Sequence, residues 1–325
     1  MKKIFLIMFS CIFLLCGCKR VNEDSIKKDL TNNISKIKGY HMTGKLEVYN
    51  GDNTFKYDVT SSKYKNNYKV SLVNKNNKHE QIIIRNNDAV YVLNPSLNKS
   101  YKFQSNWPEN SSQIYFLESI TSDITNDKNM KILDKKNGYV LECKLAFTNN
   151  KNLFKEKIYL DSNLDLKKVE VFDENKNLQM LFIVKELDKK AVFNDDYFNP
   201  NDNMNTSETE ETMSQIDDTI YPMYLPSGTY LSNEENVSLE NGERVILTFA
   251  GETPFIMVQE TVDLDKEEMS VSGDPEFIVD TVGAISDNSI EFISNGISYY
   301  ISSESMNSHE MMQVAESLSP ITVMK

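Results

Sequence analysis

Cys18 is the residue whose surroundings most directly predict chemistry, because it ends the run Leu15-Cys16-Gly17-Cys18. Two lysines and a short apolar stretch precede this run. Such a stretch suits the core of an export signal and is too short to cross a bilayer as a helix. An aliphatic residue, a spacer, a small residue and a cysteine resemble a bacterial lipobox, in which the cysteine is acylated and becomes the new N-terminus. Residues 1–18 are therefore predicted to be a lipoprotein signal peptide with its lipobox, and Cys18 to carry a diacylglycerol.

The predicted lipid decides where the protein resides. A diacylglycerol supplies two fatty acyl chains, and two chains anchor a protein stably where one is marginal. We therefore expect an exported protein that its N-terminal lipid holds at the outer face of the cell membrane. Ordinary secretion, with cysteines that stand in this pattern by coincidence, is the alternative.

Cys143 is the cysteine that remains after Cys18, so the mature chain cannot form an intramolecular disulfide. Strand alternation places Cys143 on one face with Tyr139 and Leu141, which predicts a buried structural thiol. A catalytic thiol is disfavoured because the three histidines are scattered along the sequence.

The acidic clusters lack the pattern of a catalytic or metal site. They stand in polar stretches that are typical of solvated surface, at Glu208, Glu210, Glu211, Asp217, Asp218, Glu267 and Glu268. Catalytic carboxyl pairs need surroundings that separate their two pKa values. A calcium loop of the EF-hand type needs a glycine spacing that Asp263–Glu268 does not have. Because the sequence also lacks GxSxG, HExxH, CxxC and phosphate-loop motifs, we predict no enzyme activity, no cofactor and no metal.

The elements that follow the signal are predicted to be mainly strands. An amphipathic helix is predicted over residues 23–38, where aliphatic residues recur at helical spacing. A second helix is predicted over residues 111–125, with Ser111 or Ser112 as its cap. Short alternating segments around them are typical of an antiparallel meander. These predicted strands are 40–50, 55–59, 68–72, 81–85, 89–93, 99–104, 131–133, 139–145, 156–160, 167–172 and 179–184.

Composition divides the chain near residue 199. Residues 199–219 have almost no apolar side chains, which predicts a flexible acidic linker between a domain at 19–198 and a smaller acidic domain at 220–325. Residues 199–325 hold 24 acidic and 3 basic residues, whereas residues 1–198 hold 24 acidic and 32 basic residues. The acidic half would repel phosphate, which argues against nucleic acid as a partner. The basic half could lie near anionic lipid or wall polymer, unless both sets of charges merely solvate the surface.

The smaller domain is predicted to be α+β. Its predicted strands are 244–249, 255–260, 276–282, 289–293 and 297–301. Asn295-Gly296 is the strongest hairpin signal in the chain, because both residues accept the positive φ that a two-residue turn needs. A short helix is predicted over residues 308–318, with methionines on its apolar face.

Two stretches, Leu93–Lys99 and Phe103–Pro108, carry a resemblance to a known family. They resemble the LolA-like sporulation and germination lipoproteins of endospore formers, of the GerS type, which are related to LolA, LolB and the RseB N-terminal domain. The resemblance implies an α+β fold that is mainly antiparallel β. It comprises a LolA-like half-open β-barrel covered by helices and, as in the longer members, an acidic C-terminal domain. It also implies that the membrane concerned is a forespore membrane.

The resemblance further implies a function in the spore cortex. GerS-type proteins bind and activate the zinc amidase CwlD, whose action leads to muramic-δ-lactam in cortex peptidoglycan. We therefore expect a membrane-anchored, non-catalytic adaptor or activator of a CwlD-like amidase. The alternative is a LolA-like carrier or sensor that binds a lipid or other apolar ligand in the barrel. A cell-wall hydrolase is a distant third.

Three aromatic residues are the candidates for binding a partner or ligand: Tyr91, Phe103 and Trp107. Trp107 is expected either to plug the core under the second helix or to form an aromatic anchor at the barrel mouth. An interior filled by side chains such as Phe55, Tyr57, Tyr91 and Phe103 would favour the adaptor over the carrier. Exposed strand edges would also permit a homodimer by strand exchange.

Overall fold

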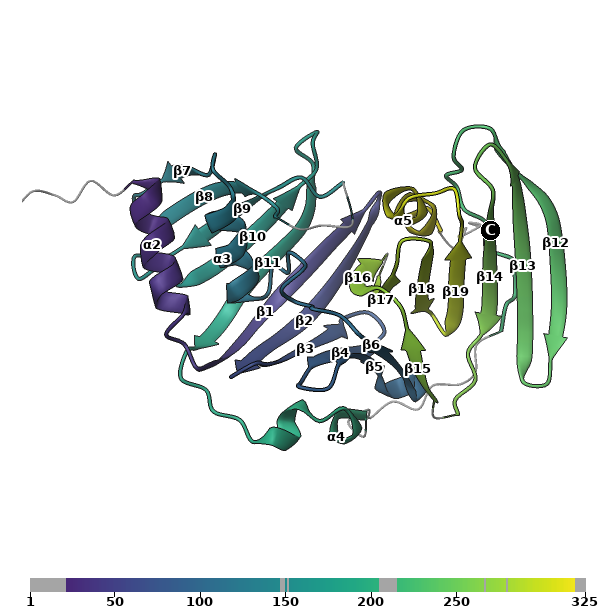
Figure 1. Ribbon diagram of the computed structural model, residues 1–325, viewed down its shortest axis with the longest axis horizontal. Coiled ribbons are helices and arrows are strands. Elements are labelled where there is room, and N and C mark those ends of the chain that lie inside the picture. Colours follow the sequence, from purple (N-terminus) through teal and green to yellow (C-terminus); the bar gives the residue numbers. More distant parts are fainter. Residues whose placement is uncertain are drawn as a thin grey trace, which may run out of the picture.

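The computed structural model describes residues 22–146, 150, 152–204, 215–265, 267–278 and 280–318. These residues form a large sheet of twelve strands and a smaller sheet of seven strands (Figure 1). The predicted signal peptide with Cys18, and residues 205–214 of the predicted linker, lie outside the described residues.

The large sheet runs in the order β15-β6-β5-β4-β3-β2-β1-β11-β10-β9-β8-β7. Its strands are β1 (Gly39–Asn50), β2 (Asn53–Tyr64), β3 (Asn67–Asn74), β4 (Glu80–Arg85), β5 (Val90–Asn94), β6 (Lys99–Phe103), β7 (Lys131–Asp134), β8 (Tyr139–Lys144), β9 (Lys155–Leu160), β10 (Leu166–Phe172), β11 (Leu178–Asp188) and β15 (Glu267–Val271). Its neighbours are antiparallel apart from β15 and β6, which run parallel. The predicted mainly antiparallel sheet is thus confirmed. The sheet is open, because its end strands β15 and β7 do not pair with each other.

The small sheet is antiparallel throughout and runs β12-β13-β14-β19-β18-β17-β16. Its strands are β12 (Thr229–Leu239), β13 (Gly242–Gly251), β14 (Phe255–Thr261), β16 (Asp274–Ile278), β17 (Thr281–Ile285), β18 (Ser289–Ser294) and β19 (Ile297–Ser302). The predicted Asn295-Gly296 hairpin joins β18 to β19, with φ of 52° and 73° at the two residues. This prediction is confirmed, and its reason is the left-handed backbone that the tight turn requires.

The first helix, α2 (Glu23–Ile34), begins where the sequence predicts it. The side chain of Asn22 accepts a hydrogen bond from the backbone N–H of Ser25, and the Ser25 hydroxyl accepts one from the backbone N–H of Asn22. This reciprocal cap satisfies two backbone donors that a helix start leaves open. Ile26 and Leu30 are the buried residues of α2, and they pack in the core as their helical spacing predicts.

The second helix, α3 (Leu117–Asn126), starts later than predicted, and neither Ser111 nor Ser112 caps it. Phe116 stands at the cap position without a side-chain hydrogen bond. The Ser112 hydroxyl instead donates to the Asp123 carboxylate on the flank of the helix, at 2.8 Å. The predicted cap is therefore wrong: the chain enters α3 through the core, where burial of Phe116 fixes the helix start.

Three hydrophobic cores hold these elements together. The main core joins one face of the large sheet to α2 and α3, which lie side by side (Figure 1). It also contains four residues from the C-terminal part of the chain: Val262, Val282, Ala284 and Ile293. The second core joins the small sheet to α5 (Ser308–Glu316), the predicted C-terminal helix. The two halves of the chain therefore share a sheet and a core.

The third core lies against Ile82, Ile84 and Tyr91, on β4 and β5. A chain segment with η3 (Asp195–Phe198) and α4 (Pro200–Met204) packs there through Phe198 and Met204. Residues 200–204 belong to the predicted linker, so its first turn is ordered against the sheet. A further short helix, η2 (Pro95–Leu97), joins β5 to β6.

Candidate functional site

The three aromatic residues that the sequence singles out do not form one site. Phe103 and Trp107 lie in the main core with no exposed surface, whereas Tyr91 lies in the third core at 6% exposure. Trp107 packs edge-on against Phe116, with 5.3 Å between ring centroids. The Tyr91 hydroxyl donates to the Asp88 carboxylate. All three side chains are buried, which favours the core interpretation of Trp107 and leaves none of them accessible to a docking partner.

The face of the large sheet beneath α2 and α3 is filled with side chains. Tyr40, Met42, Leu46, Phe116 and Phe182 are all fully buried there. At the margin of this region a cavity of about 80 Å³ lies between β1, β11, β16 and the end of α5. Pockets for small molecules usually enclose roughly 300–1,000 Å³. That margin cavity is therefore too small for a fatty acyl chain without rearrangement of the core.

A buried acidic pair anchors α3 to the sheet. Asp123 on α3 and Glu156 on β9 are 2% and 0% exposed. Burial raises the pKa of both carboxyl groups, and the charge of Asp123 raises that of Glu156 further. Paired carboxyl groups can serve as an acid–base dyad, but these two are closed to substrate. Their position gives them a structural role.

Cys143 belongs to the same cluster. It is buried, as the sequence predicts, and its thiol donates to the Glu156 carboxyl at 3.4 Å. Burial, followed by the nearby charges of Glu156 and Asp123, raises the pKa of the thiol. A catalytic thiol needs the opposite shift, since the thiolate is the nucleophile. Cys143 is therefore a structural residue of the core.

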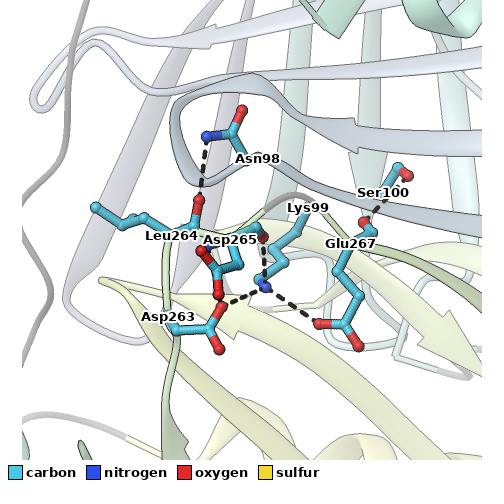
Figure 2. A network of polar contacts seen from close by, with 7 residues as sticks. All are labelled: Asn98, Lys99, Ser100, Asp263, Leu264, Asp265 and Glu267. Atoms are coloured by element: carbon cyan, nitrogen blue, oxygen red, sulfur yellow. Dashed lines mark hydrogen bonds and ion pairs between the residues drawn. The ribbon is translucent and has the colours of Figure 1, made fainter. Parts of the chain in front are cut away.

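The polar site that stands out is a lysine clamp between β6 and β15 (Figure 2). The side chain of Lys99 is 5% exposed, and its ammonium group donates to Asp263 at 2.7 Å, to Glu267 at 3.1 Å and to the Asp265 carbonyl at 2.9 Å. Burial lowers the pKa of Lys99, but the two carboxylates outweigh burial and raise it overall. The clamp holds the charged form of the lysine.

Backbone contacts extend the clamp along the strand (Figure 2). Asn98 donates through its side chain to the Leu264 carbonyl at 3.1 Å, and its own carbonyl accepts from the Glu267 N–H at 3.1 Å. The parallel register then runs from Glu267 beside Lys99 to Val271 beside Phe103. The acidic C-terminal part of the chain is thus joined to the basic N-terminal part by sheet pairing and by charge.

Replacing Lys99 with methionine is expected to lower the free energy of unfolding by about 1–3 kcal/mol. Methionine keeps the apolar stem but removes three charge-assisted hydrogen bonds. Lys102→Met is the matched control on β6, since Lys102 pairs with Asp88 in an exposed contact, and exposed ion pairs contribute little to stability. Urea unfolding of both variants measures the difference. Equal losses would contradict a clamp role for Lys99.

A groove of about 420 Å³ opens beside the clamp, where the outer face of the small sheet meets β15. Its apolar surface comes from Ile246, Val258, Met269, Ile293 and Tyr300. Tyr300 is 40% exposed, so the apolar surface reaches solvent. Sheet pairing explains the arrangement, because Ile246, Val258 and Tyr300 stand opposite one another across β13, β14 and β19.

Carboxylates surround this groove. Glu260 pairs with Arg244 at 2.5 Å, and Asp263 and Glu267 pair with Lys99. Glu291 also lines the groove and has no hydrogen-bond or ion-pair partner among the described residues. Burial, followed by the charge of Glu267, raises the pKa of the Glu291 carboxyl. The groove therefore combines an apolar floor with one carboxylate, that of Glu291, which no cation of the described part of the chain neutralises.

These features describe a protein built on two β-sheets, with a core filled by side chains and an acidic groove on its surface. The chain belongs to the family of YdcC-like sporulation proteins, whose sequence profile matches residues 1–198. It is 31% identical over 315 residues to the sporulation protein YdcC of Bacillus subtilis (strain 168), covering 94% of this chain and 93% of that relative. The predicted membership of a sporulation protein family is confirmed.

Solved structures show only distant similarity. MucB matches with a TM-score of 0.36 and 13% identity, over 90% of this chain and 98% of MucB. The LolA superfamily protein NE2245 from Nitrosomonas europaea matches with a TM-score of 0.31 and 15% identity, over 56% of this chain and 99% of that chain. Similarity at this level says nothing about function.

The described residues include neither a metal-binding cluster nor a membrane-spanning helix. No group of three or more His, Cys, Asp or Glu side chains in the described ranges is placed to hold a metal ion. None of the helices that the structure describes has the length and apolar character needed to span a bilayer.

Proposed function

We propose that this protein is a lipid-anchored, non-catalytic adaptor that holds a cell-wall amidase of the CwlD type at a membrane during sporulation. The family supplies the sporulation context. The observation that carries the adaptor role is the filled face of the large sheet, where Trp107, Phe116 and Phe182 are fully buried. A scaffold with a solid interior acts through its outer surfaces.

The anchor at Cys18 is the second part of the proposal. A protein that its own acyl chains hold in a bilayer cannot shuttle lipid between membranes, but it can concentrate a partner there. A tethered adaptor raises the effective concentration of its partner at the membrane without changing the chemistry of that partner. This favours an adaptor over the LolA-like carrier, as does the small volume of the margin cavity.

The mature chain without its acylated Cys18, residues 19–325, is expected to form a stoichiometric complex with the CwlD-type amidase of the same cell. Size-exclusion chromatography with light scattering measures the complex. Muramic-δ-lactam in the cortex of a deletion strain measures its consequence and is expected to be lost. The purified chain alone is expected to leave peptidoglycan uncut in a zymogram. Free migration of both proteins, with normal cortex in the deletion strain, would contradict the adaptor.

The carrier alternative is decided by a separate experiment. Native mass spectrometry of the acylated protein, extracted from membranes in mild detergent, is expected to show the covalent lipid alone. A second, non-covalent lipid at one copy per chain would favour the carrier. It would require the side chains of the main core to move apart, which methyl NMR of Met42 would detect.

A further inference from the structure

The groove beside the lysine clamp has the shape and chemistry of a socket for one side chain. Its apolar surface lies on two sides: Ile246 and Val258 come from the small sheet, and Met269 comes from β15 of the large sheet. All described lining residues belong to strands or to the short connection after β14. Such walls hold their geometry better than loops do.

The charges of the groove are unbalanced. Among the lining residues that the structure describes, the carboxylates of Glu260, Asp263, Glu267 and Glu291 stand against two cationic groups, Lys99 and Arg244. Both cations already form ion pairs: Lys99 with the carboxylates of the clamp and Arg244 with Glu260. Glu291 is left without a partner among the described residues, and burial together with Glu267 disfavours its charged form. A further cation would relieve that cost.

We propose that this groove binds a basic side chain, arginine or lysine, that a partner protein presents to it. The aliphatic stem of such a side chain would cover Ile246, Val258 and Met269, while its charged end would meet Glu291. Long basic side chains bury their methylene stems on apolar surface in this way. The inference deepens the proposed adaptor function, on which it rests for the existence of a protein partner.

The charge of the surrounding surface supports the same occupant. Residues 199–325 contain 24 acidic and 3 basic residues, so the whole C-terminal part attracts cations and repels anions. A symmetric contact between two copies of this chain is disfavoured at the groove, because the acidic half of one copy would have to approach the acidic half of the other. The expected partner therefore carries a basic surface patch with one arginine or lysine at its centre.

Binding is tested with N-acetyl-arginine amide and N-acetyl-lysine amide, added to the mature chain labelled at its Met and Ile methyl groups. We expect saturable chemical-shift changes at Met269 and Ile246, with Kd on the order of millimolar for a single side chain. The neutral analogue N-acetyl-citrulline amide is expected to bind at least about fivefold more weakly, since one partly exposed ion pair contributes up to about 1 kcal/mol.

Two glutamate variants make this test specific. Glu291→Gln is expected to weaken binding about fivefold and to remove the preference for arginine over citrulline. Glu252→Gln is the matched control, because Glu252 is an exposed carboxylate at the end of the small sheet and does not line the groove. Equal binding of arginine and citrulline amides, or unchanged binding in E291Q, would overturn the inference.

Probe binding at the groove and formation of the amidase complex are separate measurements, so either can fail without the other. If the probes fail to bind while the amidase complex forms, the adaptor stands and the groove is not its docking point. If the probes bind as expected but no complex forms, the groove serves another basic partner. Shifts at Met269 that grow with protein concentration in the absence of probe would assign the groove to a second copy and overturn the inference.

Discussion

Trp107→Ala is expected to lower the free energy of unfolding by about 3–5 kcal/mol, the usual cost of removing a buried tryptophan. The side chain has no exposed surface and packs against Phe116, so its loss leaves a cavity between α3 and the sheet. Guanidinium unfolding, followed by the circular dichroism of the strands, measures the loss. If Trp107 were instead an exposed anchor, its replacement would hardly change stability. A fall in the free energy of unfolding of less than about 0.5 kcal/mol would therefore support the anchor interpretation.

Trp107→Phe is the matched variant for this prediction. The indole N–H of Trp107 has no hydrogen-bond acceptor among the described residues, so phenylalanine removes an unpaired buried donor together with part of the ring. An unsatisfied buried donor costs about 1–3 kcal/mol, which offsets part of the lost packing. We expect the free energy of unfolding of W107F to be much closer to that of the parent chain than the free energy of unfolding of W107A is. A loss of stability in W107F as large as that in W107A would contradict this prediction.

Ending the chain at residue 198 is expected to destabilise the large sheet rather than to release an independent domain. The truncation removes β15 and the four residues that the C-terminal part contributes to the main core. Burial of each Val or Ile side chain contributes about 1.5–3 kcal/mol, so the loss is expected to reach roughly 5 kcal/mol or more. It also leaves β6 as a bare edge, which invites association between copies.

Thermal unfolding and light scattering of fragment 19–198 measure both effects. We expect a fall in Tm of about 10 °C or more and the appearance of oligomers. Co-expression with fragment 215–325 is the control and is expected to restore a soluble one-to-one complex. A monomeric fragment with the Tm of the full chain would contradict this prediction and support the proposed division into domains at 19–198 and 220–325.

Local patterns sufficed for the elements whose cause is local. Helical spacing of Ile26 and Leu30 predicts α2, and the positive-φ turn at Asn295-Gly296 predicts the hairpin of β18 and β19. The start of α3 could not be predicted in the same way. Ser112 is a good capping residue by type, but a tertiary contact with Asp123 takes its hydroxyl.

The site needed contacts that no local pattern encodes. Residues 267–271 begin with two glutamates, a composition that predicts solvated surface. They form β15 because their backbone pairs with the edge of β6 and Glu267 forms an ion pair with Lys99. The pairing joins positions 168 residues apart, beyond the reach of periodicity. The groove combines side chains of four antiparallel strands with Met269 of β15, so Glu291 gave no signal in the sequence.

The parallel pairing of β15 with β6 also sets an order of events during synthesis. The ribosome must translate residues 267–271 long after β6 has emerged, so the twelve-stranded sheet cannot be completed while the chain is still short. Closing so long a loop carries an entropic cost that slows folding. Until then, β6 (Lys99–Phe103) is an unpaired edge strand of the nascent protein, and a chaperone could bind this extended segment.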